Sequence, residues 1–198
     1  MKAYEREYKE LNLHLFDEVL ELIAQEDRVL SRPGLLFFAF IIVGGCILLA
    51  GISGVGRRTI SQIVAHFREL EFISPKIGRN YSIKEFKKDL KNVFQLTGIE
   101  NRPTILFIED HQLLHPQILE YVNSLISSWE IPGLYAPEEL EPILTQLQDE
   151  VKNQYQFRHA FDFFRYKIMT NLRVVLSLDS THPQFLTNCS SNPALYAK

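Results

Sequence analysis

The chain has 198 residues, of which 46% are hydrophobic and 23% are charged, and this is the composition of an ordinary globular domain with a sizeable core. A net charge of −3 gives no reason to expect nucleic acid as the main partner. The two cysteines, Cys46 and Cys189, lie far apart and form no C-x-x-C motif, so the sequence suggests neither a disulfide framework nor a zinc site.

Residues 1–33 are predicted to form an N-terminal helix and a linker. From Glu7 to Val29, apolar residues recur at three- and four-residue spacings among acidic residues, which is the pattern of an amphipathic helix. The sequence RPG at 32–34 then ends the helix. We expect the main domain to occupy residues 34–198.

The next segment is strongly apolar, since residues 34–56 include no charged side chain. By length alone, the run that includes Leu35–Val43 could span a membrane. The part from Cys46 to Ala50, however, reads as a buried strand that leads into a glycine-rich loop. Two interpretations therefore stay open, a membrane anchor and an apolar insertion at about 35–44 in front of that strand.

Helical and strand-like patterns alternate through the rest of the chain. Helices are predicted at Thr59–Phe67, Tyr81–Leu96, Pro116–Ile126, Pro137–Val151 and Phe157–Thr170, and strands at Glu71–Ser74, Thr104–Ile108 and Leu172–Leu178. This alternation predicts an α/β fold, a parallel sheet with helices on its faces. Ligands of such sheets bind beyond the carboxyl ends of the strands.

The glycine-rich loop at residues 51–59, GISGVGRRT, has the frame of a phosphate-binding P-loop. In the pattern G-x-x-x-x-G-K-[ST], backbone N–H groups surround phosphate oxygens, the lysine reaches the β- and γ-phosphates, and the hydroxyl binds Mg²⁺. Here arginine replaces both the lysine and the hydroxyl residue. The predicted nucleotide-binding residues are Gly51, Ser53, Gly54, Val55, Gly56, Arg57, Arg58 and Thr59.

These substitutions change the chemistry expected of the loop. Arg57 can still pair with phosphate through its guanidinium group, whereas Arg58 cannot bind Mg²⁺. Thr59 is no simple replacement, because one step along a helix turns a side chain by about 100°. The alternative is that Gly51, Gly54 and Gly56 only form a tight turn between a strand and a helix.

Two acids, Glu109 and Asp110, follow the second long strand, where P-loop enzymes carry an aspartate near Mg²⁺ and, in the AAA+ branch, a glutamate that polarises the attacking water. The order is reversed here. Glu109 could hold Mg²⁺ weakly through a water, but the shorter Asp110 would hold its carboxylate farther from a γ-phosphate, which matters for positioning a nucleophile. We therefore expect slow hydrolysis or none.

Four segments resemble the fourth AAA+ module of dynein heavy chains: SRPG at 31–34, the loop at 51–59, EIPGLY at 130–135 and SNPAL at 191–195. The EIPGLY element is the most specific of them. The double arginine, together with IED at 108–110, looks most similar to the cytoplasmic dynein 2 branch, which drives retrograde intraflagellar transport.

The resemblance implies a ring of six AAA+ modules in one heavy chain, with this one as a regulatory site for ATP or ADP and Mg²⁺ as a candidate companion ion. It implies neighbouring AAA+ modules, microtubules, and dynein light and intermediate chains as partners, and the cytoplasm, cytoskeleton and cilium as locations. Asp179 would align with a sensor residue, where its charge would oppose ATP more than ADP. Glu109, Asp110 and Asp179 are then the residues of a degenerate catalytic site.

The resemblance also implies that residues 34–198 form an incomplete large subdomain, which ends before the last core strand, the helical lid and the microtubule-binding stalk. The favoured function is a nucleotide-binding regulatory module with weak or no hydrolysis, in a parent motor that is an ATPase. The alternatives are a structural scaffold that binds no nucleotide and a membrane-tethered P-loop protein.

Overall fold

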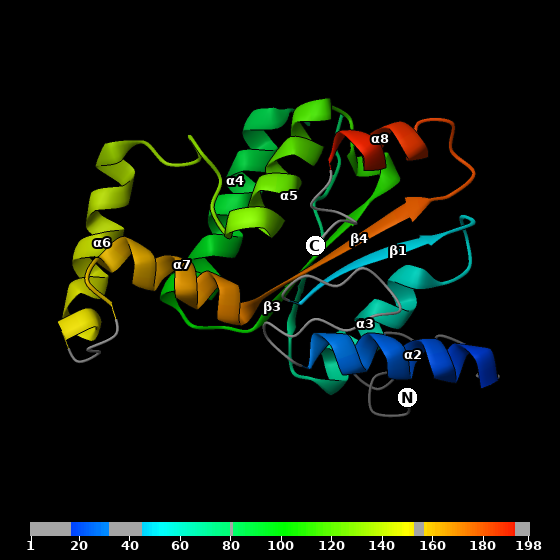
Figure 1. Ribbon diagram of the computed structural model, residues 1–198, viewed down its shortest axis with the longest axis horizontal. Coiled ribbons are helices and arrows are strands. Elements are labelled where there is room, and N and C mark those ends of the chain that lie inside the picture. Colours follow the sequence, from blue (N-terminus) through cyan, green and yellow to red (C-terminus); the bar gives the residue numbers. More distant parts are fainter. Residues whose placement is uncertain (1–16, 32–44, 80, 153–156, 193–198) are drawn as a thin grey trace.

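The computed structural model describes residues 17–31, 45–79, 81–152 and 157–192. Its centre is a parallel sheet of four strands in the order β1-β4-β3-β2 (Figure 1). The strands are β1 (Cys46–Gly51), β2 (Glu71–Ile73), β3 (Thr104–Glu109) and β4 (Leu172–Asp179). The predicted parallel sheet flanked by helices is confirmed.

Helices surround the sheet and connect its strands. They are α2 (Asp17–Leu30), α3 (Arg57–Phe67), α4 (Ile83–Phe94), α5 (Pro116–Ser128), α6 (Pro137–Lys152), α7 (Ala160–Asn171) and α8 (Phe185–Ser191). A π-helical turn, Gln95–Ile99, extends α4, and a 3₁₀ turn, Asp110–Gln112, follows β3.

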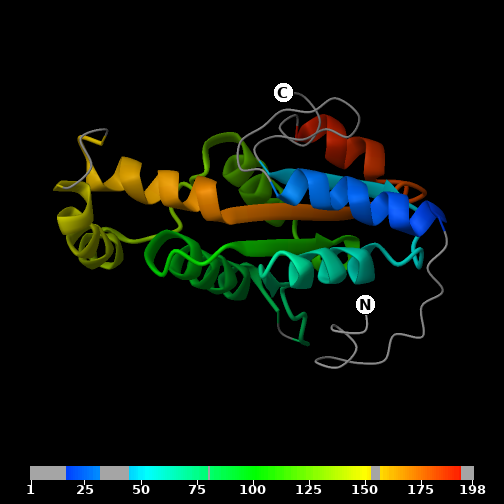
Figure 2. The same cartoon turned by 90° about the horizontal axis from the view of Figure 1, so that it is seen from below.

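Alternate side chains of the central strands enter two separate cores. Leu106 and Val174 pack with the apolar faces of α4 and α5, whereas Ile105, Phe107 and Val175 pack with α2 and α3. Figure 2 shows α2 and α3 across one face of the sheet. Because both faces are covered, β3 and β4 are buried along nearly their whole length and consist mainly of apolar residues, as parallel strands usually do.

Local sequence signals set several of the observed boundaries. Ser82 caps α4 by accepting a hydrogen bond from the Lys84 N–H, and Glu85 bonds back to the Ser82 N–H, which is a capping box. The helix therefore begins at Ile83, two residues after the predicted start. The short helix α8 had no equivalent among the predicted elements.

The apolar run at 35–44 lies outside the described residues, as does the predicted helix before Asp17. In the part of the chain that is described, no helix has both the length and the apolar character needed to cross a membrane.

Helix α2 buries an acid against α3. Glu26 is 5% exposed, and its carboxylate accepts a hydrogen bond from the Ser61 hydroxyl at 3.3 Å. The other carboxylate oxygen has no hydrogen-bond partner within the described residues. Burial raises the pKa of Glu26 to about 7, with the Ser61 bond acting in the opposite direction.

This buried acid should make stability depend on pH. The folded-state pKa lies above that of an unfolded glutamate, so the protonated form favours folding, and stability should fall as pH rises from about 4.5 to about 7. Replacing Glu26 with glutamine should raise the free energy of unfolding at pH 8 by about 1–3 kcal/mol and remove most of this pH dependence.

Urea unfolding at pH 5 and pH 8 measures both effects. Glu21→Gln, at an exposed position of the same helix, is the matched control and should leave the pH dependence in place. Equal pH dependence in the wild type and in Glu26→Gln would contradict the assignment.

Candidate functional site

The register of the sheet brings the ends of three strands together. Gly51 of β1 lies opposite Asp179 of β4, and Glu109 of β3 lies opposite Ser177 of β4. The loop after β1 and the acids after β3 and β4 therefore meet at one edge. This is the edge at which open parallel sheets bind ligands.

The loop between β1 and α3 has the backbone conformation that its glycines were expected to allow. Gly54 and Gly56 have φ angles of 90° and 83°, which is the left-handed region where a side chain is unfavourable. Gly56 caps α3, and its carbonyl accepts the first helical hydrogen bond, from Ile60 N–H at 2.9 Å. The start of α3 thus faces the cleft, an orientation that favours an anion.

Arg57, at the position of the P-loop lysine, turns back toward the strands. Its Nη1 donates to the carbonyl oxygens of Gly51 and Leu178, both at 2.7 Å. One guanidinium group therefore connects the carboxyl ends of β1 and β4. A side chain on Gly51 would begin only 3.4 Å from this nitrogen.

Arg58, at the position of the hydroxyl residue, forms an ion pair with Glu109. Its Nη1 lies 2.5 Å from Glu109 Oε2, and its guanidinium carbon lies 5.8 Å from the centre of the Phe107 ring. Glu109 itself is held through its backbone, because its N–H donates to Gln112 Oε1 at 2.8 Å. The second arginine and the first acid of the motif thus form one ion pair at the cleft.

Gln112 supports this region, although it was not among the predicted site residues. Its side chain is 2% exposed, and its amide group donates to Ser74 Oγ at 2.9 Å and to the Pro75 carbonyl at 2.7 Å. It therefore fixes the turn after β3 against the segment after β2. Its position three residues after Glu109 matches the capping-box spacing, which was the available signal.

The other two acids are engaged with the backbone and with hydroxyl groups. One carboxylate oxygen of Asp110 accepts a hydrogen bond from the Asp179 N–H. Burial raises the pKa of Asp110, against the lowering effects of this N–H and of the nearby Arg57. The position expected to orient a water is thus tied to the end of β4.

Asp179, the last residue of β4, bonds to the P-loop. Ser53 Oγ donates to Asp179 Oδ2 at 2.6 Å, and the Thr181 hydroxyl donates to Oδ1 at 2.6 Å. The bond from Ser53 is the main reason that the pKa of Asp179 lies well below its usual range, and Thr181 adds to it. Asp179 is therefore ionised at neutral pH and holds the P-loop to β4.

These groups surround an open cleft of about 360 Å³, within the size range of small-molecule sites. Of the predicted residues, the lining includes Ser53, Gly54, Gly56, Arg57, Arg58, Glu109 and Asp110; His111 and Ser177 complete it. Gly51, Val55, Thr59 and Asp179 are not part of this lining in the described chain, although Gly51 and Asp179 bond to residues that are.

The cleft does not suit a resident Mg²⁺. This ion requires oxygen ligands in near-octahedral geometry at about 2.0–2.1 Å. Arg58 offers no oxygen, the Glu109 carboxylate pairs with Arg58, and the Ser53 hydroxyl is bonded to Asp179. Nor does any cluster of three or more metal-binding side chains occur elsewhere in the described ranges.

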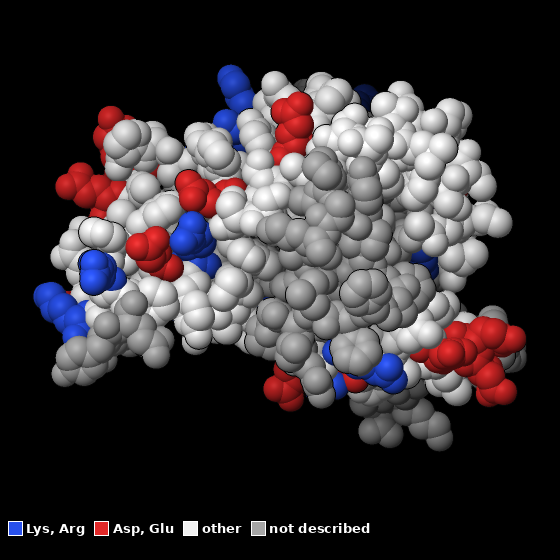
Figure 3. Space-filling view, in the orientation of Figure 1, with Lys and Arg blue, Asp and Glu red and all other residues white. Residues whose placement is uncertain are grey.

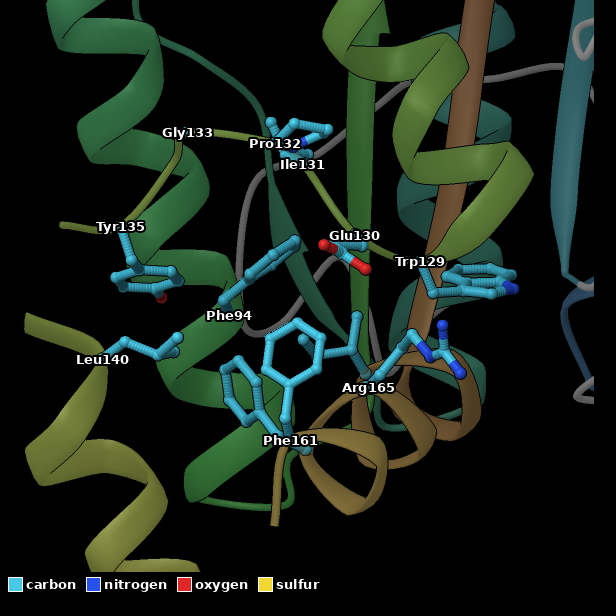
Figure 4. A pocket seen from close by; sticks show the side chains of 12 residues that line it. Phe94, Trp129, Glu130, Ile131, Pro132, Gly133, Tyr135, Leu140, Phe161 and Arg165 are labelled. Atoms are coloured by element: carbon cyan, nitrogen blue, oxygen red, sulfur yellow. The ribbon is translucent and has the colours of Figure 1, made fainter. Parts of the chain in front are cut away.

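The EIPGLY element lies at the other end of the sheet. A second pocket there is lined by residues of this element, by Phe94 of α4, and by Phe161 and Arg165 of α7 (Figure 4). Figure 1 shows α7 leading into the amino end of β4, away from the P-loop. Ile131 and Leu134 are buried, so the element serves packing between helices and does not contribute to the cleft.

Charged side chains show no continuous basic surface on the face in Figure 3, as far as its described residues are concerned. Lysine and arginine side chains lie there next to acidic ones.

Comparison with known proteins assigns the sequence to a family. A family described as "P-loop containing dynein motor region D4" matches residues 11–198. The human "Cytoplasmic dynein 2 heavy chain 1" is 49% identical over 195 residues, which are 98% of this chain. The protein of that name from Chlamydomonas reinhardtii is 44% identical over 201 residues and 100% of the chain. "Dynein heavy chain, cytoplasmic" of Paramecium tetraurelia is 31% identical over 200 residues, 99% of the chain.

The chain spans about 4% of the length of these relatives. The match covers the P-loop, the acids after β3 and β4, and the EIPGLY element, so the resemblance expected from those segments is confirmed. The chain belongs to the P-loop-containing D4 family of dynein motor regions, and it is similar along its whole length to cytoplasmic dynein 2 heavy chains.

Proposed function

We propose that this chain is a regulatory nucleotide-binding AAA+ module that holds ADP or ATP with little or no hydrolysis. The observation that supports this most is that one cleft combines a phosphate-binding loop with an acid that is already bonded to the protein backbone. The loop keeps the left-handed glycines and the helix start of a phosphate site, whereas Asp110, in the position expected to orient water, is bonded to the Asp179 N–H. Binding geometry is thus retained where catalytic geometry is weakened.

The charge of Asp179 supports a preference between the two nucleotides. It is ionised and bonded to Ser53 of the loop, so it adds negative charge beside the phosphate site. A γ-phosphate brings more negative charge than a β-phosphate, and the repulsion would be stronger for ATP than for ADP.

The relatives' names support a place for the module in a motor. We propose that it works beside other AAA+ modules in a dynein heavy chain, and that this motor acts on microtubules with dynein light and intermediate chains in retrograde intraflagellar transport. Its locations would then be the cytoplasm, the cytoskeleton and the cilium. The names "Cytoplasmic dynein 2 heavy chain 1" in human and in Chlamydomonas reinhardtii are the basis for this assignment.

A structural scaffold is the second candidate, and the contacts of Arg57 favour it. The guanidinium donates to two backbone carbonyls and in this way joins β1 to β4 without any ligand. In a scaffold, the former phosphate residue would only hold the sheet together.

The two adjacent arginines should differ in their contribution to stability. Arg57→Met removes a charged donor from two carbonyls, and we expect a loss of about 1–3 kcal/mol in the free energy of unfolding. Arg58→Met breaks an ion pair whose arginine is 43% exposed, so its cost should stay below about 1 kcal/mol. Urea unfolding of both variants without nucleotide measures the difference. Equal losses would show that Arg57 does not join the strands.

Nucleotide titration separates the regulatory site from the scaffold. A fluorescent ADP analogue should bind the 198-residue chain and raise its unfolding temperature, and the ATP analogue should bind more weakly. Phosphate release from ATP should be far slower than the roughly 10 s⁻¹ typical of enzymes. Absence of binding at millimolar nucleotide would favour the scaffold, and turnover at an ordinary enzymatic rate would contradict the proposed loss of hydrolysis.

A further inference from the structure

We propose that this cleft binds its nucleoside diphosphate or triphosphate without Mg²⁺, with the guanidinium group of Arg58 taking the place of the metal ion. The inference rests on the proposed function, because it names the chemical form of the nucleotide that the site would hold. Arg58 and Glu109 stand at positions that a magnesium-dependent site would use differently.

Arg58 and Glu109 occupy two positions that serve Mg²⁺ in a P-loop site. In a P-loop site the residue after the lysine supplies a hydroxyl to Mg²⁺, and a carboxylate after the neighbouring strand supports the same ion. Here those two positions are Arg58 and Glu109, and their side chains bond to each other at 2.5 Å. One ion pair therefore stands where two metal ligands would be.

The ion pair of Arg58 and Glu109 is held in place by neighbouring side chains. The Glu109 backbone is bonded to the buried Gln112 side chain, and the Arg58 guanidinium lies 5.8 Å from the Phe107 ring centre. Both members of the pair line the cleft, and the Arg58 side chain is 43% exposed to it and to solvent. These contacts position the guanidinium group at the cleft, and some of its N–H donors stay accessible to a ligand.

The chemistry of the Arg58 side chain suits a phosphate ligand. A guanidinium group remains protonated and carries five N–H donors in a planar arrangement that matches phosphate oxygens. It can pair with a phosphate through charge-assisted hydrogen bonds, and it thereby supplies positive charge that Mg²⁺ would otherwise provide. The possible oxygen ligands of Mg²⁺ are also engaged, because Glu109 pairs with Arg58, and Ser53 and Asp110 have partners at Asp179. The cleft therefore favours the metal-free nucleotide.

Without Mg²⁺, such a site would hold nucleotide but hydrolyse it poorly. In phosphoryl transfer, Mg²⁺ bridges the β- and γ-phosphates and neutralises the charge that develops. A fixed guanidinium bonded to Glu109 can neutralise a resting phosphate but does not reproduce that bridge.

A titration of a fluorescent ADP analogue onto the 198-residue chain, in excess EDTA and in excess Mg²⁺, tests the inference. We expect dissociation constants that agree within about twofold, or tighter binding in EDTA. Binding at least about tenfold weaker in EDTA would overturn the inference and leave the proposed function standing. Absence of binding under both conditions would overturn the proposed function and this inference with it.

Substitution of Arg58 identifies the cation. Arg58→Thr restores a hydroxyl and removes the guanidinium, so affinity in EDTA should fall by about tenfold and Mg²⁺ should recover part of it. The matched control is Arg68→Thr, because Arg68 lies at the far end of α3, is also 43% exposed, and pairs with Asp27. The control should bind ADP equally with and without Mg²⁺. Unchanged affinity of Arg58→Thr in EDTA would show that Arg58 is not the cation.

Glu109→Gln gives a second and opposite test. If Arg58 replaces the metal, removing the carboxylate frees the guanidinium and removes a repulsive charge, so affinity for ADP in EDTA should stay equal or increase. If Glu109 instead holds Mg²⁺, the substitution should weaken binding in Mg²⁺ and contradict the inference. Unfolding curves of each variant establish that the comparison is made between folded chains.

Discussion

The site depends on the parallel register of β1, β4 and β3. Because Gly51 pairs with Asp179 and Glu109 with Ser177, three strand ends that are far apart in the sequence finish at one edge. The apolar faces of α4 and α5 on one side, and of α2 and α3 on the other, hold this register, since a slip of one residue would turn every core side chain to the wrong face. The chemistry of the cleft therefore follows from the packing of the core.

Within the cleft, each charged group that departs from the usual P-loop pattern has a partner inside the protein. Arg57 bonds to the carbonyls of Gly51 and Leu178, Arg58 pairs with Glu109, and Asp110 accepts the Asp179 N–H. A P-loop enzyme directs such groups toward the phosphates, the metal and the water. Here these groups bond to one another and to the backbone. This agrees with the proposed weak catalysis at a loop that keeps its phosphate-binding conformation.

Much of the fold could be predicted from the sequence because buried parallel strands leave long apolar runs, as at Thr104–Ile108 and Leu172–Leu178. The loop could be recognised because glycine at 54 and 56 is required by φ angles that other residues rarely adopt. The side-chain partners could not be predicted, since they depend on the direction of each side chain. Arg57 is an example, since no pattern in the sequence indicates that its guanidinium bonds to the carbonyls of Gly51 and Leu178. Gln112 and the short helix α8 carried signals too weak to single out.

In the proposed site, an arginine takes the place of the metal ion of a P-loop. A crystal structure of the chain grown with ADP and Mg²⁺ would show which of the two cations contacts the phosphates. We expect an Arg58 nitrogen about 2.9 Å from a β-phosphate oxygen, with no metal ion bound beside Glu109. An octahedral ion about 2.1 Å from a β-phosphate oxygen and supported by Glu109, with Arg58 turned away, would contradict it.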